Sequence, residues 1–142
     1  MKKRILMVMA TMSFFVLLVA GVYGQGEGHI IANIPFAFIA GTKTFPAGEY
    51  TIDRPSINEP DLLLIRSVDN NQALFLNAEN VQARKTPEKT ELVFNEIGDK
   101  YFLSKIWVSG EDSGREIPKP KAERELEQAA LSQQVTLQPS GN

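Results

Sequence analysis

The stretch that decides the fold is Leu92-Val93-Phe94-Asn95-Glu96-Ile97-Gly98-Asp99-Lys100-Tyr101-Phe102-Leu103-Ser104-Lys105-Ile106-Trp107-Val108. Two runs rich in β-branched and aromatic residues flank a Gly-Asp pair, which is a typical two-residue turn between antiparallel strands. The sequence therefore predicts a β-hairpin with strands at Leu92–Ile97 and Lys100–Val108.

Short apolar runs separated by turn residues continue upstream of this hairpin. Their spacing of about 8 to 12 positions is typical of antiparallel sheets. Leu62–Ile65 is apolar on both faces and is predicted to be a central strand. The other predicted strands are 29–34, 36–40, 43–45, 49–54, 73–77 and 81–83. These runs predict an all-β, mainly antiparallel fold, either a small β-sandwich or a filled β-barrel of about 7–9 short strands.

The pattern changes after Trp107. Gly110–Gly114 is predicted to be a loop, and Pro118 and Pro120 are expected to prevent a strand in the segment that follows. Residues 119–134 are rich in Ala, Glu, Leu and Gln, which favour helix, so a C-terminal helix is predicted there. Residues 135–142 are predicted to be a disordered tail. The predicted β domain therefore spans residues 25–118.

The N-terminus has the order of an export signal. Three basic residues (2–4) precede an apolar run from Ile5 to Ala20, and small residues lead to Gly24. A signal peptidase cut after Gly24 is expected, because small side chains stand at the positions that the enzyme reads. A retained anchor helix is the alternative, since the apolar run approaches the roughly 20 residues needed to span a bilayer. Both alternatives place the domain outside the cytoplasm, as a periplasmic or secreted protein.

Charge and cysteine content limit the class of protein. The chain has 142 residues, 15 basic and 17 acidic side chains and no cysteine. Three of the basic residues lie in the leader, so the mature chain keeps 12 against 17 and a formal charge of −5. No concentrated basic patch is visible, which argues against nucleic acid as a partner. Without disulfides, stability must come from ordinary burial.

Three stretches resemble a family of small exported bacterial proteins of unassigned function. They are Phe45-Pro46-Ala47-Gly48-Glu49-Tyr50-Thr51-Ile52, Tyr101-Phe102-Leu103-Ser104-Lys105-Ile106-Trp107 and Gly114-Arg115-Glu116-Ile117-Pro118. The resemblance implies an exported, mostly β domain. It supplies no active residues to carry over.

The sequence contains no recognisable catalytic motif. Nucleophilic hydrolysis needs a base oriented beside a Ser or Cys, and the single histidine, His29, follows the predicted cut by five residues. No nucleophile elbow surrounds Ser67, Ser104 or Ser109. One histidine and no cysteine do not make a usual zinc or copper site. Carboxylate-rich turns at 59–61, 69–71 and 111–113 have the composition for calcium without its ligand order. We expect no catalytic residue, metal or cofactor.

The strand Lys100–Val108 carries the candidate binding surface. Strict alternation would place Tyr101, Leu103, Lys105 and Trp107 on one face of the sheet. If the opposite face fills the core, this face is left for a ligand, a partner or another element of the fold. Large rigid aromatic side chains suit sugar rings and peptides. The competing interpretation is that both faces are buried within the domain.

The sequence thus favours a non-catalytic binding or structural module of the cell envelope or periplasm. Its partner would be an envelope protein, a peptide or a glycan, and it would touch the membrane only through an uncleaved signal. The alternative is a barrel that carries a small ligand in its interior. A hydrolase remains a further alternative.

Overall fold

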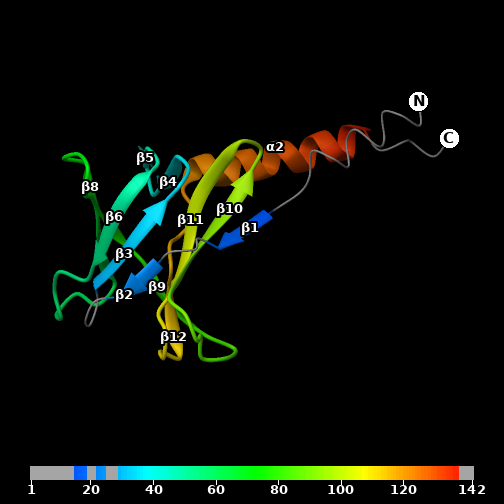
Figure 1. The fold of residues 1–142 in the computed structure, drawn as a ribbon. Coiled ribbons are helices and arrows are strands. Elements are labelled where there is room, and N and C mark those ends of the chain that lie inside the picture. The colour runs from blue at the N-terminus through cyan, green and yellow to red at the C-terminus, as the bar shows by residue number, and fades with distance from the viewer. Residues whose placement is uncertain (1–14, 19–21, 25–28, 138–142) are drawn as a thin grey trace.

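The structure, a computed structural model, describes residues 15–18, 22–24 and 29–137. The predicted hairpin is confirmed: β10 (Glu91–Ile97) pairs antiparallel with β11 (Lys100–Trp107). Gly98 occupies the turn with φ of 63°, a left-handed conformation that glycine adopts without the steric cost of a side chain. These two strands form the centre of the larger sheet (Figure 1).

The larger sheet, sheet A, has the order β1-β10-β11-β12-β9. The far side of β11 is shared by two neighbours, because β12 pairs with it at Lys105 and Ile106 whereas β4 pairs with it in parallel at Phe102. β5 extends the sheet from β4. The bounds of the remaining strands of sheet A are β1 Phe15–Leu18, β4 Phe38–Ala40, β5 Lys43–Phe45, β9 Glu79–Gln82 and β12 Ser113–Glu116.

The smaller sheet, sheet B, has the order β2-β3-β6-β7-β8 and is antiparallel throughout. β7 lies between two neighbours, as the apolar run Leu62–Ile65 at its start predicts. The strands of sheet B are β2 Val22–Gly24, β3 His29–Ile34, β6 Gly48–Asp53, β7 Leu62–Ser67 and β8 Ala73–Asn77.

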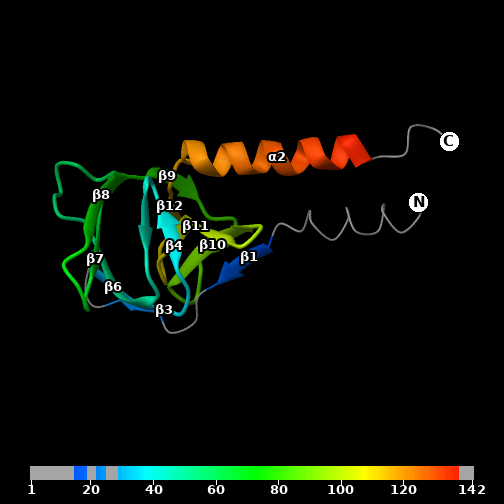
Figure 2. The same ribbon diagram turned by 90° about the horizontal axis from the view of Figure 1, so that it is seen from above.

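The two sheets pack face to face as a sandwich and do not close into a barrel (Figures 1 and 2). Aromatic side chains fill the centre: Phe38 stacks on Phe45 at 5.3 Å between ring centroids and meets Phe94 at 5.6 Å. Phe38 also meets Tyr50 of sheet B edge-on at 5.1 Å. The Tyr50 hydroxyl donates to the carbonyl oxygen of Pro46, so its polar end is satisfied within the core. The predicted fold class is thus confirmed in its sandwich form.

The sandwich has twelve strands within the described ranges, against the 7–9 expected. Part of the excess lies in the predicted leader, where β1 and β2 form. The rest is β12 (Ser113–Glu116), which begins inside the predicted loop Gly110–Gly114 and continues into the segment before Pro118, where no strand was expected. That prediction was wrong because Ser-Gly-Arg-Glu has no apolar alternation; the strand forms because β11 and β9 pair with it on either side.

The two sheets are linked along one side by β8 and β9. Only Ala78 separates these strands, and its side chain is 1% exposed. Its amide donates to the carbonyl oxygen of Asp61 at 2.8 Å. The chain therefore passes from sheet B to sheet A without a loop. On the opposite side, β1 ends sheet A and β2 ends sheet B.

The C-terminal helix α2 spans Lys121–Leu137 and packs against β10 near its N-terminal end. Figure 2 shows the rest of the helix running out beyond the sheets. A helix was predicted over 119–134; it begins after Pro120 and continues three residues further than expected. Part of the predicted tail, residues 138–142, lies outside the described residues, as do residues 1–14 and 19–21 of the predicted signal. Within the described ranges, no helix is long and apolar enough to cross a membrane.

A buried carboxyl group joins α2 to sheet A. Glu123 is 1% exposed, and its Oε2 accepts from Asn95 Nδ2 at 3.3 Å. Burial raises the pKa of the Glu123 carboxyl, which the hydrogen bond from Asn95 partly opposes. The folded state therefore holds this proton more tightly than the unfolded chain does. Stability is greatest while the group is protonated and declines as the pH rises through its folded pKa.

We expect Glu123→Gln to remove this decline, because glutamine keeps an acceptor for Asn95 and carries no charge. Between pH 4 and pH 7, the melting temperature of the native protein should fall relative to that of the variant by about 3 °C. Thermal melts at several pH values measure the difference. Glu125→Gln, on an exposed position of the same helix, is the control and should run parallel to the native protein. If the melting temperature of Glu123→Gln also changes with pH in parallel with that of the native protein, the raised pKa of the buried Glu123 carboxyl is contradicted.

Candidate functional site

The four residues of the candidate binding surface do not share one face. The register of β10 and β11 shifts between Val93 and Phe94, where β11 contains one extra residue, Ser104. Such a bulge reverses the alternation of side chains on either side of it. Leu103 consequently points into the core and is 2% exposed. The expectation of one continuous surface was wrong for this reason.

Tyr101 also belongs to the interior half of the strand. Its ring lies 4.3 Å from that of Phe36, and it packs against the core cluster. Phe102 is paired in register with Asn95, which bonds to Glu123 of α2, and it is completely buried. Only Lys105 and Trp107 therefore remain together on the outer face of sheet A.

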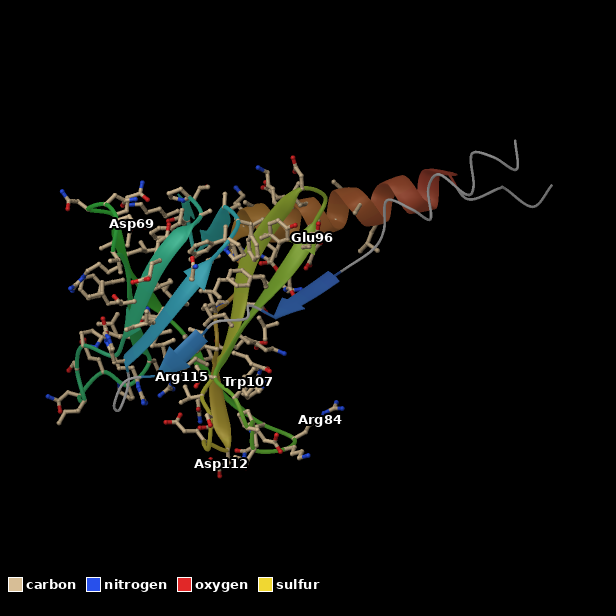
Figure 3. All side chains as sticks on the ribbon, in the orientation of Figure 1. Asp69, Arg84, Glu96, Trp107, Asp112 and Arg115 are labelled. Carbon is tan, nitrogen blue, oxygen red and sulfur yellow. The ribbon has the colours of Figure 1, made fainter. Side chains whose placement is uncertain are left out.

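Lys105 and Trp107 line a groove of about 400 Å³ on that outer face. This volume lies within the range of small-molecule sites, about 300–1,000 Å³. Figure 3 shows Trp107 toward one end of sheet A, with Arg84 on the loop beside it, whereas Arg115 points toward sheet B. The other residues of the groove are Val81, Gln82, Ala83, Arg84, Lys85, Pro87 and Glu91.

Hydrogen bonds hold the wall of the groove in place. The loop from Ala83 to Thr90 connects β9 with β10, and the segment after β11 fastens it at several points. The Ser109 hydroxyl donates to the carbonyl oxygen of Glu88 at 2.8 Å, and the Gly110 amide donates to that of Pro87 at 2.9 Å. At the other end, the Ala83 amide donates to the carbonyl oxygen of Asp112 at 2.9 Å. The groove is thus formed before any ligand arrives, which lowers the entropic cost of binding.

The indole of Trp107 lies over Gly114 on the neighbouring strand. A Cβ atom at position 114 would fall against Cε3 of the indole and within 2.7 Å of both its Cζ3 and the Ile106 carbonyl oxygen. Glycine is therefore the residue that lets the six-membered ring of the indole approach β12 this closely. The contact holds the indole in place as part of the lining of the groove.

Positive charge predominates at the groove. Arg84, Lys85 and Lys105 line it, against a single carboxylate from Glu91. Lys105 Nζ lies 3.8 Å from Glu116 Oε2, a distance typical of a weak surface pair. Within the described residues, neither Arg84 nor Lys85 has an acidic partner within 4.0 Å. The groove is thus locally basic on a chain whose formal net charge is −2.

His29 lies on β3 and contacts Asp53 of β6, to which it is paired in register. Two of the three serines considered from the sequence bond to other partners. Ser67 Oγ accepts from the amides of Asp69 and Asn70 in a turn, and the Ser109 hydroxyl serves the groove wall. The structure therefore supplies an oriented histidine without bringing these two hydroxyl groups to it.

A smaller cavity lies between the sheets at the end where Asp53, Ser113 and Arg115 gather. Its volume is about 50 Å³, which is room for a few water molecules. Ile30, Ile52 and other core side chains form its apolar walls. A carried ligand of ordinary size needs several times this volume.

The described ranges contain no cluster of three or more His, Asp or Glu side chains arranged to hold a metal ion. Sequence reasoning missed Arg84, Lys85 and Gly114 as parts of the groove. Arg84 and Lys85 are interspersed with acidic residues in the sequence, a pattern typical of an ordinary solvated surface. Comparisons with protein-family models, curated proteins and solved structures gave no match.

Proposed function

We propose that this chain is an exported, non-catalytic binding module of the cell envelope, and that it binds acidic saccharides in the groove around Trp107. The observation that carries the proposal is a groove that Trp107 lines together with three basic side chains, with the indole held against Gly114. Export rests on the leader sequence and on the family resemblance, both of which stay predictions.

The chemistry of the groove favours a saccharide that carries carboxylates. The flat indole suits the apolar C–H face of a sugar ring, and the guanidinium of Arg84 suits a carboxylate, which it can bind through two parallel hydrogen bonds. Glu91 can accept from hydroxyl groups. The same carboxylate would repel a densely acidic peptide. A ligand with both hydroxyls and isolated acids therefore fits the lining best.

The carrier alternative receives less support, because the interior cavity of about 50 Å³ holds only water-sized occupants. The hydrolase alternative is favoured by the contact between His29 and Asp53, because a hydrolase needs an oriented histidine as its base. It still requires a nucleophile that neither Ser67 nor Ser109 supplies.

Trp107 is the single tryptophan of the chain, so its fluorescence reports directly on the groove. We expect a uronic acid oligosaccharide to change the Trp107 emission and a neutral oligosaccharide of equal length to do so at least tenfold more weakly. Arg84→Ala combined with Lys105→Ala should weaken binding of the acidic sugar about tenfold or more, the loss expected of charge-assisted hydrogen bonds. Raising the salt concentration should weaken binding as well.

Lys100→Ala is the matched control, because Lys100 is exposed at the far end of the hairpin. This variant should bind like the native protein. Equal responses to the acidic and neutral sugars, or a stronger response to an oligoglutamate peptide, would contradict the proposal. Isothermal titration calorimetry supplies the affinities independently of fluorescence.

A further inference from the structure

The residues upstream of the predicted cut occupy the free side of both sheets. β1 pairs along its whole length with β10, from Phe15 opposite Glu96 to Leu18 opposite Val93. β2 pairs with β3, from Val22 opposite Ala32 to Gly24 opposite Ile30. Figure 1 shows these two strands following one another along one side of the sandwich. They lie on the side opposite the junction of β8 and β9.

A cut after Gly24 would remove both strands together. β10 would then be an edge strand, with the hydrogen-bonding groups on one side of its backbone left unpaired. β10 is a poor edge, because its sequence Glu-Leu-Val-Phe-Asn-Glu-Ile has no proline and no lysine. Natural edges are usually short, charged with lysine, interrupted by proline or covered. Leu92 and Phe94 of this strand are completely buried in the chain that carries β1.

We propose that the mature protein accepts an extended, uncharged, apolar segment of another polypeptide along β10, in the place that Phe15–Leu18 fills in the precursor. The leader strand acts as a temporary occupant of this edge. The proposal rests on the export of the proposed function, with the expected cut after Gly24, and not on the saccharide site. Addition of a strand to an exposed sheet edge is an established mode of peptide recognition.

The charges of β10 favour pairing with a strand of a different polypeptide over pairing with β10 of a second copy of this chain. Each copy has Glu91 and Glu96 on this strand and no basic residue. Two β10 strands paired antiparallel would bring four carboxylates to one interface, between mature chains that each carry a formal charge of −5. Phe15-Val16-Leu17-Leu18 has no charge. Its composition therefore describes the segment that the edge accepts.

The test uses the full chain, made by cell-free synthesis in mild detergent so that no peptidase removes the leader. Val16→Pro with Leu17→Pro takes two amide donors from β1 and should release the β10 edge. A synthetic peptide of residues 13–19 with an uncharged solubilising tail is the probe. We expect it to bind the released variant at least tenfold more tightly than the native chain. Hydrogen exchange of the β10 amides should quicken in the variant and slow again with the peptide.

Two N-methylated peptides separate strand pairing from general apolar adhesion. In a strand, alternate amides face the neighbouring strand, so methylation at positions 15 and 17 and methylation at 16 and 18 should differ. One pattern should abolish binding, and the other should retain it. Equal effects of the two patterns, or no binding of the parent peptide, would overturn the proposal. If the variant forms dimers in analytical ultracentrifugation without peptide, the β10 edge accepts a second copy of the chain, and the claim that it accepts a different polypeptide is contradicted.

If the proline variant does not fold alone, the parent peptide should restore its circular dichroism in trans, and failure to do so counts against the edge site. The response of Trp107 to acidic saccharide is measured in the same samples, because β1 pairs with residues 93–96 of β10 whereas the groove includes only Glu91 of that strand. Loss of one response with retention of the other shows which proposal has failed.

Discussion

Phe38→Ala should lower the free energy of unfolding by about 3–5 kcal/mol, the usual cost of truncating a buried phenylalanine to alanine. Phe38 is 1% exposed and contacts aromatic rings of both sheets, since Phe94 belongs to sheet A and Tyr50 to sheet B. Its removal opens a cavity at the contact between the layers. Domains of this size have about 5–15 kcal/mol of stability in total, so the variant should be close to unfolding.

Urea unfolding followed by Trp107 fluorescence measures the loss. Phe75→Ala is the matched control, because Phe75 on β8 is 59% exposed, and its truncation should cost about 0.5 kcal/mol or less. The two variants remove the same atoms, so their difference isolates burial. Similar unfolding midpoints for both would contradict the position assigned to Phe38.

Gly114→Ala has the second largest expected effect, a loss of about 2–3 kcal/mol together with displacement of the Trp107 ring. The new methyl group would overlap the indole and the carbonyl oxygen of Ile106. Because the ring must leave β12, we expect its emission to shift to longer wavelength and binding of acidic saccharide to weaken. Equilibrium unfolding and fluorescence spectra measure the two effects.

A double-mutant cycle with Trp107→Ala identifies the cause. Once the indole is gone, Gly114→Ala should cost clearly less, and the remainder reports the contact with the Ile106 carbonyl. Gly110→Ala is the control, since Gly110 has φ of 80° and open space around it. It should cost about 1–2 kcal/mol through backbone strain without shifting the Trp107 emission. Additive effects of the two substitutions in the cycle would contradict the contact between the indole and position 114.

Features specified by local sequence were predicted well. The hairpin of β10 and β11 was predicted because its turn and both strands are contiguous. The central position of β7 followed from a run that is apolar on both faces. The helix after Pro120 was predicted from composition, and its end was misjudged because nothing in the sequence marks a stop before Leu137.

Features that depend on distant pairing were not predicted. β12 is polar and becomes a strand only between β11 and β9. The bulge at Ser104 breaks the alternation that the surface prediction assumed. One signal was present: Leu103 and Ile106 are apolar at a spacing of three, which a regular strand does not bury on one face. Half of the candidate surface, Lys105 and Trp107, reached the groove, whereas Arg84 and Gly114 join it through contacts that no local pattern shows.

The passage of the chain through Ala78 has a mechanical consequence. A force that pulls the two layers apart on that flank is borne by covalent bonds. On the opposite flank, β1 of sheet A and β2 of sheet B follow one another in the chain, so that flank is tied as well while both strands are present. If β1 and β2 are removed, the layers should separate first at the edges of β10 and β3, with the run from Ala73 to Gln82 as the hinge.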